Sequence, residues 1–285
     1  MQNTISHVPE CNVKHTVRAK YYRTAEGVTK LAKVQQLSFP AFRISGFEDS
    51  EGKSEVDVQL DKLFTEAEAS VTEDQTYDQD AEEKNRARAL RRAKNTAFDK
   101  ILCNPDLDIF VTLTIDPEVV FERDSYDEIY DLIKHWLKNR VQRRDLKYVM
   151  PPEHHKNGAI HFHAIMNSSA LDLVTAINYH TKKPLYHNGQ PLYNVSDWKF
   201  GFSSAEMIQG ADLDREKVAK YIFKYMGKQG IEGKIGGRYV LSGGKFEKPI
   251  YVYGDSPFDF ILDEDGSYFR MVEHDGGIYK EWSFI

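Results

Sequence analysis

Residues 146–166 read LKYVMPPEHHKNGAIHFHAIM and carry the clearest structural pattern in the chain. Two apolar segments flank a polar turn that contains Asn157-Gly158, which is typical of antiparallel strands joined by a tight turn. Side chains alternate between the two faces of a strand, so His161 and His163 should lie on one face and apolar residues on the other. The stretch therefore predicts a β-hairpin with a buried face and two neighbouring imidazoles on the opposite face.

Further strands and helices are predicted on both sides of this hairpin. The sequence predicts a strand at 108–115, a strand pair within 193–208 and another hairpin within 237–253, and it predicts helices at 82–102, 125–145, 170–179 and 214–228. Antiparallel strands mixed with helices indicate an α+β fold. We expect one central antiparallel β-sheet with helices packed on its faces.

Charge is distributed unevenly along the 285 residues, whose net charge is −6. Residues 47–83 contain 14 acidic residues and 2 lysines, and residues 254–285 contain 8 acidic and 2 basic residues. The remainder is strongly basic, which is compatible with a nucleic-acid partner. We therefore divide the chain into an N-terminal extension (1–46), an acidic segment or linker (47–83), a main domain (84–253) and an acidic C-terminal tail (254–285).

The sequence shows no signal segment and no apolar run long enough to span a bilayer. Its two cysteines, Cys11 and Cys103, are far apart and outside any metal-binding spacing. We expect a cytoplasmic protein of a bacterial host cell, with reduced cysteines and no membrane contact.

The predicted helix at 82–102 is rich in basic residues. They gather in its first half: Lys84, Arg86, Arg88, Arg91, Arg92 and Lys94. Such a helix can simply present a solvated face, or it can contact the phosphates of DNA. Both interpretations remain open, and Arg86, Arg88, Arg91 and Arg92 are the candidate DNA-binding residues.

The two histidines of the hairpin are spaced so that both could bind one divalent ion. A third ligand would come from the preceding strand: a three-residue turn places Glu153 opposite His161, whereas a two-residue turn places His154 there. Two imidazoles, a carboxylate and open positions suit Mg²⁺ or Mn²⁺, which bind phosphate oxygens. Without further ligands, the pair could equally be two histidines on a solvated face.

The stretch KYIFKYMGK, residues 220–228, contains two tyrosines four residues apart. On a helix, Tyr221 and Tyr225 lie on one face with Lys224 and Lys228 beside them, apart from an apolar stripe. An amphipathic helix explains the apolar stripe but not the pair of tyrosines. A tyrosine hydroxyl is a poor nucleophile near neutral pH, and neighbouring cations would help it attack a phosphate.

In this order, the motifs resemble those of the HUH endonucleases, and within them the rolling-circle replication initiators of phages and plasmids with two catalytic tyrosines. Phe110-Val-Thr-Leu-Thr114 resembles the first motif, His161-Phe-His163 the second, and Tyr221 to Lys228 the nucleophile motif. The resemblance covers roughly residues 84–253. It implies a ferredoxin-like or RRM-like core whose central antiparallel sheet carries the metal-binding strand in its middle.

The resemblance also implies a reaction. A metal held by His161, His163 and Glu153 would polarise a phosphate of single-stranded DNA at a replication origin, and a tyrosine would attack it. The products would be a 5′-phosphotyrosine link and a free 3′-OH that primes synthesis. Because no P-loop motif occurs in the sequence, a host helicase and a DNA polymerase would be needed as partners.

Three other functions remain open. A plasmid mobilisation relaxase or a transposase would use the same chemistry, and a DNA-binding regulator would keep the fold without the reaction. Trp198, Phe200 and Phe202 are either core residues or platforms on which bases could stack.

Overall fold

The computed structural model of the chain describes residues 13–24, 29–40, 64, 81–116, 126–154, 160–208, 216–221, 223, 237–260, 268–274 and 277–283. The chain forms two compact units. Unit 1 comprises residues 1–21, 30–84 and 250–285, and unit 2 comprises residues 22–29 and 85–249.

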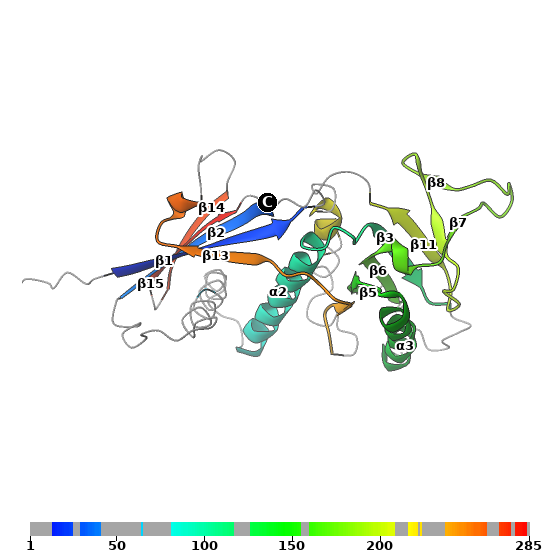
Figure 1. Cartoon of the computed structure of the whole chain (residues 1–285). Helices are drawn as coiled ribbons and strands as arrows, with labels where there is room; N and C mark the ends of the chain where they lie inside the picture. The colour runs from blue at the N-terminus through cyan, green and yellow to red at the C-terminus, as the bar shows by residue number, and fades with distance from the viewer. Residues whose placement is uncertain are drawn as a thin grey trace, which may run out of the picture. The chain divides into compact units, whose positions relative to one another are not determined.

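The centre of unit 2 is an antiparallel sheet (Figure 1). Its strands, in spatial order, are β12 (Leu241–Gly243), β4 (Tyr148–Met150), β6 (Ile160–Met166), β3 (Ile109–Thr114), β11 (Ser203–Met207), β10 (Tyr193–Val195) and β7 (Leu173–Thr175). A further strand, β5 (Pro152–His154), also pairs with β6. The predicted α+β fold is confirmed, and the histidine strand β6 lies inside the sheet rather than at an edge.

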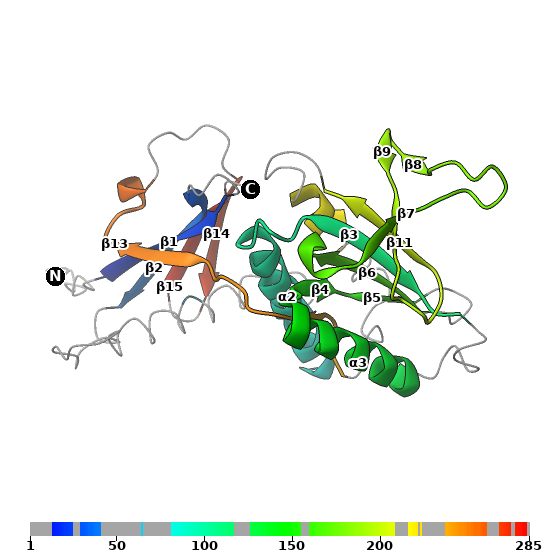
Figure 2. The same cartoon turned by 45° about the vertical axis from the view of Figure 1, so that its right-hand side comes forward.

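One face of this sheet carries the main hydrophobic core. Helix α3 (Tyr126–Arg144) lies along that face (Figure 2), and its apolar side chains pack against alternate residues of β3 and β6. The buried residues include Ile129, Ile133 and Leu137 from α3 and Val111 and Phe162 from the sheet. The helical spacing of apolar residues and the two-residue period of the strands therefore meet at one interface.

The opposite face carries the polar strand positions. Cross-strand partners point to the same side of a sheet, so Phe110 shares this face with its partner Ile165, and Thr112 shares it with His163. The helical residues 216–221 and 223 lie over this face, because Tyr221 contacts Phe110. Helix α2 (Ala81–Leu102) in turn packs against that segment through Phe98 and Phe223.

Gly201 brings the chain into β11 at very close range to β3. Its φ is +146°, and a Cβ built there would lie 2.3 Å from the backbone oxygen of Thr114. The residues on either side bond to β3: the N–H of Thr114 donates to Phe202, and that of Asp116 donates to Phe200. Glycine is therefore required for the approach that sets the β3–β11 pairing.

The structure contradicts two predicted elements. Residues 170–179 do not form a helix: a 3₁₀ turn, η2 (Ser168–Ala170), is followed by β7, and Asp108 accepts hydrogen bonds from the backbone and hydroxyl of Ser168. Residues 237–253 do not form a hairpin, because β12 pairs with β4 whereas β13 (Ile250–Gly254) pairs with β1 in the other unit. The predicted helices at 82–102 and 125–145 and the strand pair β10–β11 are confirmed.

Unit 1 contains a second antiparallel sheet, built from both ends of the chain. Its order is β13, β1 (Val13–Arg23), β2 (Thr29–Pro40), β15 (Gly277–Ser283) and β14 (Tyr268–His274). The sequence analysis treated these ends as an extension and a tail and missed their shared sheet. Of the acidic segment 47–83, the structure describes Phe64 and residues 81–83. None of the helices in the described part of the chain is long and apolar enough to cross a membrane.

Candidate active site

The hairpin register brings the predicted ligand strand beside the histidines. Glu153 pairs with His161 across β5 and β6, whereas His154 pairs with Ile160. Of the two alternatives left by the sequence, the structure selects the register that places Glu153 opposite His161. The turn residues themselves, 155–159, lie outside the described residues.

His163 is fixed at both of its ring nitrogens. Its Nε2 lies 2.6 Å from Oε2 of Glu153, and its Nδ1 lies 3.1 Å from Oγ1 of Thr112. The Phe110 ring stacks on the imidazole at 5.8 Å between centroids with an angle of 12° between the planes. Both His163 and Glu153 are largely shielded from solvent, with side chains 14% and 17% exposed. The imidazole therefore has a defined orientation on the sheet.

This hydrogen-bond pattern bears on cation binding. If Nδ1–H of a neutral His163 donates to Thr112, the Nε2 lone pair faces the Glu153 carboxylate and the contact is repulsive without a cation. If the Thr112 hydroxyl donates instead, Nε2–H donates to Glu153. Within the described part of the chain, no three His, Cys, Asp or Glu side chains are arranged to hold a metal ion. Glu153 and His163 meet as a pair, and His161 belongs to the same strand face.

Tyr221 lies next to this pair on the helical segment over the sheet. Its ring meets Phe110 edge-on at 6.0 Å, and Phe110 in turn stacks on His163. Its exposed fraction is 47%, whereas Ala219 and Glu216 of the same segment are buried. The structure therefore brings together Tyr221, His163 and Glu153. Lys224, Tyr225 and Lys228 lie outside the described residues.

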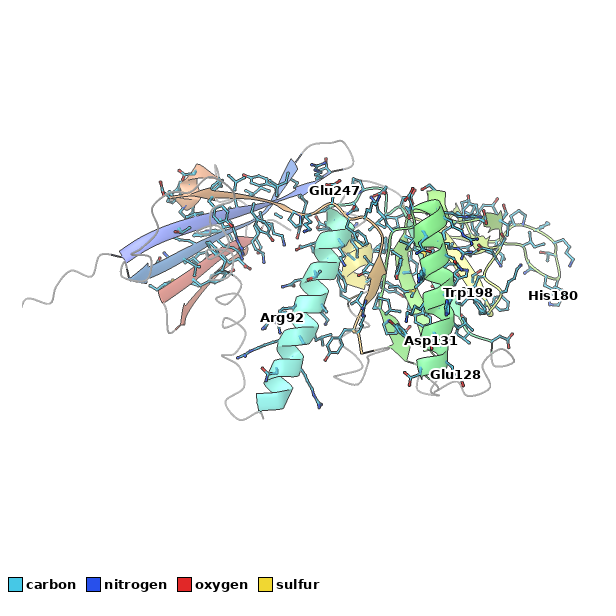
Figure 3. The ribbon with its side chains drawn as sticks, turned by 60° about the horizontal axis from the view of Figure 1, so that its bottom comes forward. Arg92, Glu128, Asp131, His180, Trp198 and Glu247 are labelled. Carbon is cyan, nitrogen blue, oxygen red and sulfur yellow. The ribbon has the colours of Figure 1, made fainter. Side chains whose placement is uncertain are left out.

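The arginines of α2 differ in exposure. Arg86 and Arg92 are exposed, and Arg88 and Arg91 are half-buried. Figure 3 shows the side chain of Arg92 on this helix. Arg92 and Lys100 line a cavity of about 230 Å³ between α2 and β12, together with Ser242, to which Lys100 donates a hydrogen bond.

The electrostatics of this cavity favour an anion. Burial lowers the pKa of Lys100, and the positive charge of Arg238 lowers it further. A bound anion would offset that repulsion. These groups are compatible with phosphate binding by α2, although Arg86, Arg88 and Arg91 do not line this cavity.

Sequence reasoning missed how Phe110 and Thr112 contribute to the site. Both lie in the first motif, and the alternation of β3 places them on one face, but their position beside His163 follows from the pairing of β3 with β6. Of the three possible stacking residues, Trp198 and Phe200 belong to the core, whereas Phe202 is 79% exposed.

The comparisons with known proteins concern this same part of the chain. Residues 108–230 match the model of a family of replication-associated proteins, the ORF2 family. The matched range runs from the residue before β3 to beyond Tyr221, so it includes Thr112, Glu153 and His163. The match supports a role in DNA replication. No curated protein and no solved structure matches the chain.

Proposed function

We propose that this protein is a rolling-circle DNA replication initiator that nicks and rejoins single-stranded DNA at an origin. The observation that supports it most directly is the series of contacts from Tyr221 through Phe110 to His163 and Glu153. All four residues lie within the range that matches a replication-associated family. A tyrosine next to a histidine and carboxylate pair is the arrangement that phosphodiester transfer to tyrosine requires.

In the proposed reaction, the Tyr221 oxygen attacks the phosphorus and the bond to the 3′ oxygen breaks. The proton leaves the tyrosine hydroxyl, and the 3′ oxygen takes up a proton to become the free 3′-OH. One phosphodiester bond is exchanged for another, so the same residues can reverse the step and rejoin the strand. Tyr225 would supply a second nucleophile, and Lys224 and Lys228 would supply positive charge near the phosphate.

Glu153, His161 and His163 are the residues that would hold Mg²⁺ or Mn²⁺. When bound, such an ion would stabilise the negative charge that develops on the phosphate. The chain contributes the fixed orientation of its ligands: Thr112 and Phe110 hold the imidazole of His163, and Glu153 lies 2.6 Å from its Nε2. The free 3′-OH would prime a host DNA polymerase, and a separate host helicase would open the duplex.

The experiment is a covalent-adduct assay with a randomised pool of labelled single-stranded DNA and Mn²⁺. We expect wild type to form a DNA adduct that resists denaturation, and the double variant Tyr221→Phe/Tyr225→Phe to form none. Tyr179→Phe is the matched control, because Tyr179 is 79% exposed and is not part of the site.

Two outcomes would contradict the proposal. An adduct that persists in the double variant would exclude these tyrosines as nucleophiles. DNA binding without any adduct in wild type would instead indicate a non-catalytic DNA-binding regulator.

A further inference from the structure

A pocket of about 760 Å³ lies beside the candidate nucleophile. Its walls come from three parts of unit 2: the hairpin of β8 (Tyr186–His187) and β9 (Gln190–Pro191), strand β11 and the helical segment 216–221. Phe110 and Tyr221 line it, so it adjoins the aromatic contact that leads to His163. The proposed function does not assign a role to this pocket.

The hairpin that forms one wall has a defined backbone. Asn188 and Gly189 have φ values of 48° and 81°, as two-residue turns with an Asn-Gly sequence require, and His187 pairs with Gln190 across the turn. The hairpin is joined to β11 because Nδ1 of His187 lies 2.9 Å from Oε2 of Glu206. The polar side chains of this wall are therefore carried on a braced turn rather than on an irregular loop.

The lining combines flat apolar surface with hydrogen-bonding groups. Phe110 and Tyr221 offer ring surface, and Met207 offers further apolar area. Asn188 and Gln190 carry amides that can both donate and accept, and the Glu206 carboxylate accepts. Aromatic surface and amide groups together are what proteins use to stack and read an unpaired base.

We infer that this pocket binds one nucleobase of the unpaired DNA strand, next to the phosphate that Tyr221 attacks. The inference rests on the proposed function, because it places the strand at Tyr221. Lys217, also in the lining, supplies a positive charge for the backbone of the bound nucleotide. The volume lies within the range of about 300–1,000 Å³ that is usual for small-ligand pockets and accommodates a base with its sugar.

Base selection at one position is the consequence. Gln190 and Glu206 present different hydrogen-bonding groups to the edge of the base, so bases that mismatch this pattern would leave polar groups unpaired. Each position along the bound strand that lies outside the pocket would contact mainly phosphate and sugar. We therefore expect one position near the cut to show a strong base preference that depends on these two side chains.

The test uses the full chain with a randomised single-stranded DNA pool, both with Mn²⁺ and without metal. Strands linked to the protein in the first arm, and strands retained by it in the second, are sequenced. In wild type we expect one position flanking the cut to be enriched for one base by about tenfold or more. Gln190→Ala should flatten that preference, and Glu206→Gln should change the preferred base, because an acceptor oxygen is replaced by a donor amide.

Gln142→Ala is the matched control, since Gln142 is an exposed amide on α3, which packs on the other face of the sheet. Circular dichroism of each variant checks that it folds, and Glu206→Gln preserves side-chain shape if Gln190→Ala does not fold. Adducts whose base preference is unaltered in both pocket variants would overturn the pocket assignment and leave the proposed function standing.

The metal-free arm separates the two proposals. No adduct with any strand, together with a base preference in binding that both pocket variants change, would support the pocket and overturn the nickase. No adduct and no base-dependent binding would overturn both.

Discussion

Thr112 is the residue that sets the orientation of the candidate ligand His163. Its hydroxyl lies 3.1 Å from Nδ1, and the two residues are cross-strand partners on β3 and β6. A hydrogen bond at one ring nitrogen decides which tautomer a histidine adopts and therefore whether the other nitrogen can bind a cation. Thr112 thus acts as a positioning residue for a ligand that it does not replace.

We predict that Thr112→Val raises the Mn²⁺ concentration needed for half-maximal DNA cleavage by about 10- to 100-fold, with little change in folding. Valine has nearly the same shape and suits a strand, so the substitution removes the hydroxyl alone. Thr112→Ser, which keeps the hydroxyl, should remain close to wild type. An unchanged Mn²⁺ requirement in the valine variant would show that Thr112 does not position the ligand.

Some of this site could be predicted one residue at a time. Strand alternation is a local rule, and it predicted that His161 and His163 share a face. The partner of His161 depended on turn length, so the sequence left Glu153 and His154 as alternatives, and the pairing of β5 with β6 decides for Glu153. The contacts of Phe110 and Tyr221 join residues far apart in sequence, and no local pattern predicts them.

At the scale of elements, α3 is attached to the loop before β11 by a partly buried ion pair. Arg140 of α3 pairs with Asp197, and its guanidinium lies over the Trp136 ring at 3.8 Å. Trp136 meets Trp198, labelled in Figure 3, edge-on at 5.2 Å. Burial, together with the charge of Arg144, lowers the pKa of Arg140 to about 10, so it remains charged at neutral pH.

We predict that Asp197→Asn lowers the free energy of unfolding by about 3 kcal/mol, because it leaves the buried charge of Arg140 without its counter-ion. Urea denaturation at pH 7 would measure the change. Asp172→Asn is the matched control: Asp172 pairs with Arg144, but both side chains are exposed, and we expect little effect. Equal effects of the two substitutions would mean that burial of Arg140 does not matter.

The elements that were predicted correctly are those with a long, regular pattern. Helices α2 and α3 and strand β3 have many residues that repeat the same period, so their sequence is sufficient. The predicted helix at 170–179 failed because the segment is held by the side chain of Asp108 and by pairing of β7 with β10. Strands β8 and β9 have two residues each, too few to show any period.

At the scale of the molecule, the chain begins and ends in unit 1 and forms unit 2 in between. Strands β1 and β2 come from one end of the sequence and β13, β14 and β15 from the other, yet they form one sheet. Pairing between such distant strands leaves no trace in local periodicity, which explains why the sequence suggested an extension and a tail. The candidate site residues that the structure describes at β3, β5, β6 and Tyr221 all belong to unit 2.

Unit 1 contains a polar network that links three of its strands. Arg18 donates to Gln35, Gln35 donates to the Tyr279 hydroxyl at 2.7 Å, and that hydroxyl donates to Glu281 at 2.5 Å. Lys33 forms an ion pair with Glu281 at 3.0 Å. Burial alone would raise the pKa of Glu281, but the charge of Lys33 and the hydrogen bonds from Tyr279, Lys33 and Gln35 outweigh it and lower that pKa.

This network predicts a pH dependence for unit 1. The folded-state pKa of Glu281 lies below its ordinary value of 4.5, so its contribution to stability is complete above about pH 4.5 and is lost as the pH falls through the folded-state pKa. Glu281→Gln should remove this component of the acid sensitivity of unit 1, so that its stability changes less between pH 5 and pH 3.

The three tryptophans of the chain can report on the two units separately. Trp282 packs in unit 1, whereas Trp136 and Trp198 pack in the core of unit 2. With 5-fluorotryptophan at all three positions, ¹⁹F NMR should show the native Trp282 resonance of wild type decreasing as the pH is lowered below 4.5, and decreasing less in Glu281→Gln. The difference should be absent from the Trp136 and Trp198 resonances, because Glu281 stabilises only the sheet to which it belongs. Identical titration of Trp282 in both proteins would show that Glu281 does not contribute to the acid stability of unit 1.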